Sequence, residues 1–151
     1  MISVDDIKKL RDETGAGVME VKKALEGAKT YQEAKAVLAK AAAKKAEKKA
    51  DRTAGDGLVY SYIHTTGKIG SLVEINCETD FVAKTDDFKK LCQEVAMQVC
   101  ALGANSVEDL LKQEYIRDNS RKMSDLVTET IAKLGENIKI ARVTRYTVGG
   151  E

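Results

Sequence analysis

The sequence has few of the residues that most often carry chemistry at a site. Its 151 residues include one histidine, three cysteines and no proline. Cys77, Cys92 and Cys100 form no CxxC pair, and one histidine cannot complete a zinc-binding set with them. Unpaired cysteines of this kind are typical of a reducing cytosol. We therefore expect a cytoplasmic protein that uses no metal and no other cofactor.

Long apolar runs are missing as well. The first residues give a helix signal rather than an apolar signal segment, and no stretch approaches the length that would span a bilayer. These absences argue against secretion and against a membrane as a partner.

Motifs for nucleotide binding and for covalent catalysis are also absent. No GxGxxG pattern or GxxxxGK pattern occurs, and Gly15-Ala16-Gly17 lies between two predicted helices, so we interpret it as a turn. His64 stands at the end of a predicted strand, and no nearby serine or cysteine completes a nucleophile–base pair. We therefore expect neither direct nucleotide binding nor enzymatic activity.

Charge is balanced over the whole chain but not along it. The 25 basic and 24 acidic residues nearly cancel, so the chain lacks the overall field of a nucleic-acid-binding protein. Between residues 35 and 52, however, there are seven basic residues and only two acidic ones, Glu47 and Asp51. A solvated linker helix is one interpretation. The alternative function is a ribosome- or RNA-associated module that contacts phosphates, although no interleaved aromatic rings are present to stack on bases. The basic residues are Lys35, Lys40, Lys44, Lys45, Lys48, Lys49 and Arg52.

The first fifty residues predict three helices, over 3–15, 18–27 and 30–50. Each of the first two ends at a glycine, and capping boxes begin the first and third. Residues 40–50 are almost entirely Ala, Lys and Glu, which favours helix but offers no core side chain larger than methyl. We interpret this last stretch as a helical linker.

The rest of the chain predicts a small antiparallel sheet covered by two amphipathic helices. Residues 58–63 and 69–75 form a hairpin, and a last strand over 138–147 loses its alternation near Ala141, which indicates a bulge. One helix begins at Asp86 or Asp87 and ends at Gly103, with Cys92 and Cys100 buried on its apolar face.

The second helix runs from about Ser120 to Gly135. The predicted fold class is therefore α+β, with a three-helix bundle and linker over 1–52 and a core domain over 53–151.

One segment mixes a helix-capping carboxylate with a large ring. It is Thr79-Asp80-Phe81-Val82-Ala83, directly after the second strand. In one interpretation Asp80 caps the next helix and Phe81 packs into the core. In the other the ring projects into a partner, as aromatic side chains on loops often do. The pattern alone favours neither.

Three segments resemble the signatures of the elongation factor Ts family, in family order across nearly the whole chain. They are LRDETGAGVM with KKAL at residues 10–19 and 22–25, NCETDFVAK at 76–84, and AKLGENI at 132–138. The resemblance implies a ubiquitin-associated-like bundle, an α+β core, and elongation factor Tu as partner, GDP-bound and nucleotide-free.

The resemblance also implies a mechanism. In that family the Asp-Phe pair, here Asp80 and Phe81, presses between helices of the partner's GTPase domain, disturbs its magnesium site and loosens its hold on phosphate. The implied function is guanine nucleotide exchange during translation elongation.

The same resemblance places partner contacts on all three signatures and on the hairpin. The expected contact residues are Thr79, Asp80, Phe81 and Val82, then Arg11, Val18, Met19 and Lys22 in the bundle, Leu134 and Gly135 in the third signature, and His64 at the hairpin tip.

One departure from the family pattern is a missing helical arm. Family members with a single core hairpin usually carry a long helical insertion before the final helix, whereas only residues 102–119 separate the two amphipathic helices here. Relatives with one core unit can dimerise so that two copies supply the partner contacts, so we expect a homodimer.

Overall fold

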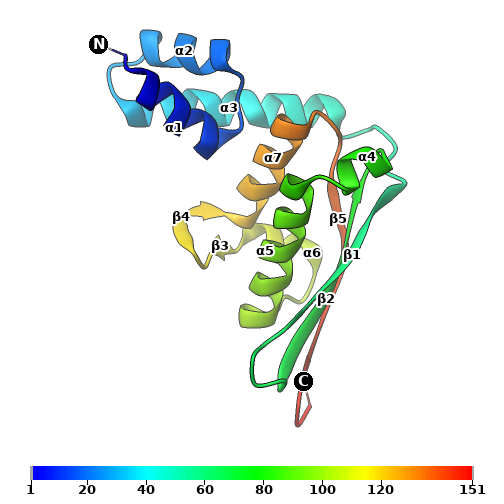
Figure 1. Ribbon diagram of the computed structural model, residues 1–151. Helices are drawn as coiled ribbons and strands as arrows, with labels where there is room; N and C mark the ends of the chain where they lie inside the picture. The colour runs from blue at the N-terminus through cyan, green and yellow to red at the C-terminus, as the bar shows by residue number, and fades with distance from the viewer. Residues whose placement is uncertain (1, 151) are drawn as a thin grey trace.

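The computed structural model describes residues 2–150 and has the predicted α+β fold. Three helices form an N-terminal bundle, and the third extends from this bundle across one end of a core of helices and a long, narrow sheet (Figure 1). No helix among residues 2–150 is long and apolar enough to cross a membrane. The bundle helices are α1 (Val4–Thr14), α2 (Val18–Gly27) and α3 (Tyr31–Lys49).

The bundle helices begin and end where the sequence predicts. The Ser3 side chain caps α1 by accepting from the Asp6 N–H at 3.0 Å, and Gly15 ends it at a φ of 71°. A left-handed residue at this position favours glycine because it has no Cβ. Leu10 and Val21, both fully buried, pack in the small core of the bundle.

Helix α3 is continuous and belongs to two cores at once. Ala34 and Leu38 are buried in the bundle, while Ala42 is buried and Ala46 packs against the core domain. Small side chains on this flank allow α3 to lie close to the core helices. Residues 40–49 are helical as expected, but the interpretation of residues 35–52 as a solvated linker helix is wrong for this flank, because methyl groups suffice for helix–helix contact.

The core sheet has three antiparallel strands in the order β1-β2-β5. Its register is interrupted where Glu74 pairs with Arg142 but Ile75 pairs with Ile140, so Ala141 has no partner and the predicted bulge is confirmed. One face, which includes Val73 and Ile75, packs on the helices. The strands are β1 (Asp56–Ile63), β2 (Ile69–Cys77) and β5 (Lys139–Thr147).

Helix α5 (Asp86–Leu102) covers that buried face, and α7 (Met123–Leu134) packs against α5 and α3, so only one of the two predicted helices lies directly on the sheet. Thr85, rather than Asp86 or Asp87, caps α5, because its hydroxyl accepts from the Phe88 N–H at 3.2 Å. Helix α7 begins at Met123 and not near Ser120, which lies in a strand. Cys92 and Cys100 are buried, as predicted.

Four short elements complete the chain and were not predicted. A buried glutamine, Gln98, holds the small hairpin in place: its amide donates to the Glu114 carbonyl at 3.0 Å and accepts from the Ile116 N–H at 3.1 Å. The short elements are α4 (Asp80–Ala83), α6 (Val107–Lys112), β3 (Glu114–Tyr115) and β4 (Asp118–Lys122).

Three polar residues, which we call the loop clamp (Glu78, Glu136 and Asn137), tie the segments at one end of the core together. The Glu136 carboxylate accepts from the N–H groups of Glu78 and Thr79 at 3.1 and 3.0 Å and from the Thr79 hydroxyl at 2.8 Å. The Glu78 carboxylate in turn accepts from the Asn137 N–H at 2.9 Å. The turn after β2 and the turn before β5 are therefore joined in both directions.

The Asn137 side chain extends the loop clamp to the segment that follows α3. Its amide donates to the carbonyls of Arg52 and Ala50 at 2.8 and 3.3 Å, and the residue is only 2% exposed. The same amide group thus connects the end of α3 to the core.

Replacing this amide should destabilise the protein. We expect Asn137→Ala to lower the free energy of unfolding by about 1–3 kcal/mol, since two carbonyls lose their donor at a buried site. For a domain of this size that corresponds to roughly 2–4 °C in melting temperature per kcal/mol. Urea unfolding followed by circular dichroism measures the change. Asn105→Ala, in the exposed loop after α5, is the control, and equal stability of the two variants would contradict the role of the loop clamp.

Candidate partner-binding surface

The Phe81 ring projects from a short helix that the loop clamp holds in place. Thr79 caps α4: its hydroxyl accepts from the Val82 N–H at 3.4 Å while donating to Glu136. Phe81 is 80% exposed, whereas Ala83, two residues later, is buried. The interpretation in which Phe81 packs into the core is therefore wrong, and the ring projects from the surface. The capping role considered for Asp80 is also wrong, because Asp80 is the first residue of α4 and its carboxylate pairs with Lys84 at 3.4 Å.

An exposed phenyl ring on a fixed helix is a typical interface anchor. Burying a side chain of this size stabilises a protein or complex by about 1.5–3 kcal/mol, and this free energy is not realised within the chain itself. The four residues of α4 are tied at the N-cap by Glu136 and packed at Ala83. The ring can therefore enter a partner with little loss of backbone freedom.

Cys77, which ends β2 just before this turn, has no role as a nucleophile. It is fully buried, and its thiol donates to the Thr79 carbonyl at 3.1 Å. Burial, reinforced by the nearby Glu136 carboxylate, raises the pKa of Cys77 to about 11. The thiol therefore stays protonated at neutral pH and serves as a buried side chain and weak donor.

The predicted contacts in the bundle lie on exposed positions of α1 and α2. Met19 is 74% exposed and Val18 is 45% exposed, both in the first turn of α2, and Arg11 and Lys22 are exposed as well. The preceding turn rests on α7, where a Cβ added to Gly15 would lie 2.9 Å from the Lys133 Cβ. This close approach fixes the start of α2 relative to the core.

The remaining predicted residues lie at two different places. Leu134 is half-buried against the core, and Gly135, exposed at a φ of 78°, ends α7 directly before the loop clamp. His64 is exposed at the tip of the β1–β2 hairpin, at the far end of the sheet from α4 (Figure 1). Its ring nitrogen lies 3.4 Å from the Tyr62 hydroxyl.

The structure therefore groups the predicted residues unevenly. It brings Thr79–Val82 together with Leu134 and Gly135 through Glu136. The bundle residues Val18, Met19 and Lys22 lie on α2 around Glu20, which pairs with Lys45 in the second half of α3, and His64 is separate from both groups. A partner that contacts all of them must extend along much of the molecule.

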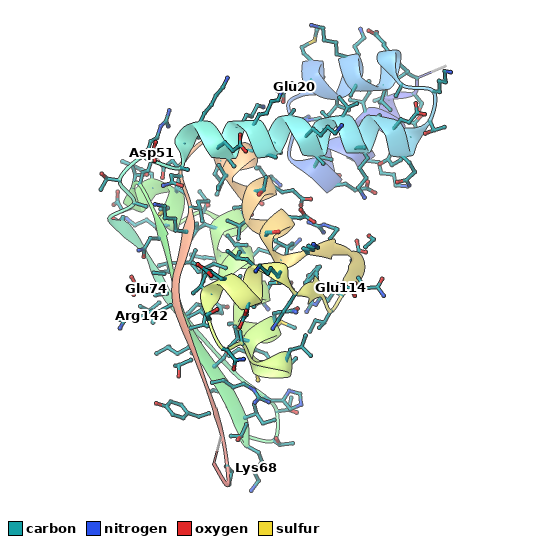
Figure 2. All side chains as sticks on the ribbon, turned by 180° about the vertical axis from the view of Figure 1, so that it is seen from behind. Glu20, Asp51, Lys68, Glu74, Glu114 and Arg142 are labelled. Carbon is teal, nitrogen blue, oxygen red and sulfur yellow. The ribbon has the colours of Figure 1, made fainter. Side chains whose placement is uncertain are left out.

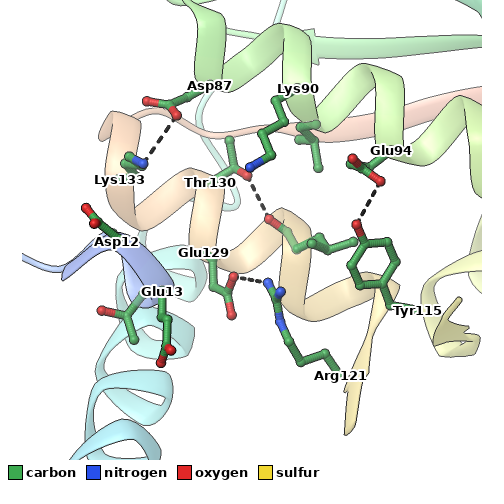
Figure 3. A pocket seen from close by; sticks show the side chains of 14 residues that line it. Asp12, Glu13, Asp87, Lys90, Glu94, Tyr115, Arg121, Glu129, Thr130 and Lys133 are labelled. Carbon is green, nitrogen blue, oxygen red and sulfur yellow. Dashed lines mark hydrogen bonds and ion pairs between the residues drawn. The ribbon is translucent and has the colours of Figure 1, made fainter. Parts of the chain in front are cut away.

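A polar cleft between the bundle, α5 and α7 is lined by many acidic and basic side chains (Figure 3). The Tyr115 hydroxyl donates to the buried Glu94 carboxylate at 2.7 Å, and burial raises the pKa of Tyr115 to about 12. Arg121 pairs with Glu129, yet burial outweighs that charge and raises the pKa of Glu129. Lys133 pairs with Asp87 at 3.2 Å.

These pairs join the small hairpin to the helices, although the Nε of Arg121 is buried without a hydrogen-bond partner among the described residues. Among residues 2–150, no group of three His, Cys, Asp or Glu side chains could hold a metal ion. We assign the cleft a structural role.

Prediction from the sequence missed the outer face of the sheet. Four large apolar side chains there are exposed, on all three strands. The sequence of β2 did carry a signal for this face. Leu72 lies on the face opposite to the buried residues Ser71 and Val73, so both faces of β2 carry apolar groups. Glu74 and Arg142 form an ion pair at 2.8 Å on this face (Figure 2). The exposed apolar residues are Val59, Ile63, Leu72 and Tyr146.

Comparison with known proteins shows similarity along nearly the whole chain. The family model described as elongation factor TS matches residues 78–151. Elongation factor Ts of Coprothermobacter proteolyticus is 41% identical over 194 residues, covering 98% of each chain. Elongation factor Ts of Thermotoga neapolitana is also 41% identical, covering 99% of this chain and 98% of its own. Elongation factor Ts of Clostridium acetobutylicum is 44% identical over 148 residues, which is 97% of this chain and 48% of the relative.

The first two alignments are longer than the chain itself. They span 194 residues against 151, so these relatives carry at least 43 additional positions. The identity nevertheless extends over almost every part of this sequence. The chain belongs to the elongation factor Ts family of translation elongation factors.

Proposed function

We propose that this chain is the guanine nucleotide exchange factor of elongation factor Tu, and that it accelerates GDP release in the cytoplasm during translation elongation. The observation that carries the proposal is the exposed Phe81 ring on a helix fixed by Glu136. The ring and Asp80 would press between helices of the partner's GTPase domain and disturb its magnesium and phosphate site. No covalent step on this chain is required.

Exchange of this kind follows from reciprocal coupling. A factor that binds nucleotide-free partner more tightly than GDP-bound partner must weaken GDP binding by the same ratio. The partner would therefore be recognised in both its GDP-bound and its nucleotide-free state. GTP enters once GDP has left, because the factor holds the intermediate only transiently.

We also propose a division of labour between residues 1–52 and 53–151. The first unit would dock through Arg11, Val18, Met19 and Lys22 and thereby set the affinity. The second would carry Phe81, supported by contacts from Leu134, Gly135 and His64, and thereby set the maximal exchange rate.

Truncation of the ring tests the central proposal. We expect Phe81→Ala to reduce the acceleration of fluorescent GDP release from elongation factor Tu at least tenfold, about 1.4 kcal/mol, with unchanged thermal stability because the ring is exposed. Leu102→Ala removes a 57% exposed apolar side chain elsewhere and should exchange normally. If Phe81→Ala is as active as the parent, or if the parent at micromolar concentration has no effect, the proposal is wrong.

A negative charge introduced into the docking surface tests the division of labour. Met19→Glu should raise the concentration of factor needed for half-maximal GDP release about tenfold, equivalent to about 1.4 kcal/mol of binding, and leave the maximal rate unchanged. Val4→Glu changes an equally apolar residue, 81% exposed on α1, and is the control. A fall in maximal rate with no change in half-saturation would exclude docking by the bundle.

We further propose that two copies associate through the outer sheet face. Exposed Leu72 and Tyr146 offer apolar contact, and Glu74 and Arg142 give the face both charges, so it can complement itself about a two-fold axis. Two sheets packed in this way form an ordinary sandwich about 10 Å thick.

The association has a direct test. Analytical ultracentrifugation at tens of micromolar should give the mass of two chains for the parent and of one chain for Leu72→Lys combined with Tyr146→Glu. Val4→Lys should stay dimeric. A monomeric parent, or a double variant that remains dimeric, would exclude this face as the interface.

A further inference from the structure

The seven basic residues between positions 35 and 52, six on α3 and Arg52 just after it, divide into two groups according to their partners. Three of the seven pair with carboxylates of the bundle or the core: Lys35 with Glu13 at 3.5 Å, Lys45 with Glu20 at 2.6 Å, and Arg52 with Glu78 at 3.7 Å. The Lys45 contact also lowers the pKa of Glu20. These three side chains have a structural use.

The other group has no such use. Within residues 2–150, Lys40, Lys44, Lys48 and Lys49 have no carboxylate within ion-pair distance. Lys40, Lys44 and Lys48, which we call the lysine stripe, are exposed and follow one another at intervals of four residues. They therefore lie along one flank of the helix, about 6 Å apart along its axis.

Stability of the helix does not account for the lysine stripe. Like charges four residues apart destabilise a helix by about 0.2–0.5 kcal/mol per pair, and the stripe contains two such pairs. Lys48 can interact favourably with the negative end of the helix dipole, but that effect is confined to the last turn. Lys40 and Lys44 lie in the middle of α3 and gain nothing from it.

The neighbours of the lysine stripe leave it open to a large partner. Most exposed residues beside it are alanines, and Glu47 is the one exposed carboxylate on the second half of α3. Figure 2 shows α3 lying across the end of the core, with the outer side of its second half, toward Asp51, not covered by another helix. The ammonium groups of the lysine stripe form a straight row, which complements the row of negatively charged phosphates along a nucleic-acid backbone.

The chemistry favours RNA over a membrane. A helix that lies on a membrane needs a row of large apolar side chains beside its basic ones, whereas the apolar flank of α3 is buried and only Val37 is a large exposed apolar residue on it. The stripe has no arginine for bidentate base contacts and no aromatic ring for stacking, so phosphate contacts are what its three ammonium groups favour.

We infer that the lysine stripe of α3 binds the phosphate backbone of RNA without sequence preference, a binding activity separate from nucleotide exchange. With three phosphate contacts, the dissociation constant should rise roughly 20- to 40-fold between 50 and 200 mM salt, because each contact releases a counterion. The proposal does not depend on Phe81 or on the bundle contacts.

The test compares two variants of equal net charge. Lys40→Gln, Lys44→Gln and Lys48→Gln together remove the stripe, whereas Lys89→Gln, Lys112→Gln and Lys139→Gln together remove three exposed lysines of the core domain. Fluorescence anisotropy with a labelled single-stranded RNA of mixed sequence measures binding of the full chain. We expect the first variant to bind about tenfold more weakly at 50 mM salt, with a reduced salt slope, and the second to bind like the parent.

Several results would overturn the inference. They are equal losses in the two variants, salt-independent binding by the parent, and tighter binding of anionic phospholipid vesicles or of polyglutamate than of the RNA. Circular dichroism verifies that both variants fold, and GDP release from elongation factor Tu by the first variant shows whether exchange survives loss of the stripe. Retained exchange supports a separate activity, and lost exchange would assign the lysines to the GTPase partner instead.

Discussion

The geometry of the molecule depends on the carboxylate of Glu136 and the amide of Asn137. These neighbouring residues occupy the short connection between α7 and β5, and together they reach the turn after β2 and the segment after α3. Both are inside or at the edge of the core, where an unpaired polar group would be costly. Glu136 needs the turn after β2 and Asn137 needs the segment after α3, so the connection is fully hydrogen-bonded only when all three segments are in place.

This arrangement explains how a small protein can hold an aromatic ring in water. A four-residue helix has almost no stability of its own. Here the N-cap of α4 is bonded to Glu136, and Ala83 is buried under the sheet and α5. Exposure of Phe81 therefore reflects fixed backbone geometry on both sides of it and not a loose loop.

Much of the fold was readable from local patterns, for identifiable reasons. Glycines at the ends of helices, such as Gly15 and Gly135, take left-handed conformations that few other residues adopt, so the helix ends were predictable. The bulge at Ala141 was visible as a slip in alternation. The small hairpin was not, because its strands of two and five residues are mostly polar and are held by the distant Gln98.

The site was only partly readable. The family resemblance supplied its residues but not their relative positions. Whether Phe81 is buried or exposed could not be decided locally, because a bond from Thr79 to Glu136, 57 residues away, determines it. The pairing of Lys45 with Glu20 likewise depends on how two helices cross. The lysines of α3 can be counted from the sequence. Only the packed structure shows which of them pair with a carboxylate and which do not.

The continuity of α3 has a mechanical consequence. Its 19 residues form one rod of about 28 Å that enters both cores, so it acts as a ruler that sets the position of the bundle relative to the core domain. A ruler of this kind can change length only in steps. Gain or loss of one residue would turn the bundle by about 100° around the rod, whereas a whole turn would nearly preserve its facing and shift it by about 5.4 Å. Insertions or deletions in this helix can therefore preserve the facing of the bundle only when they come close to a whole turn. The alanines and lysines themselves can be substituted without changing this constraint.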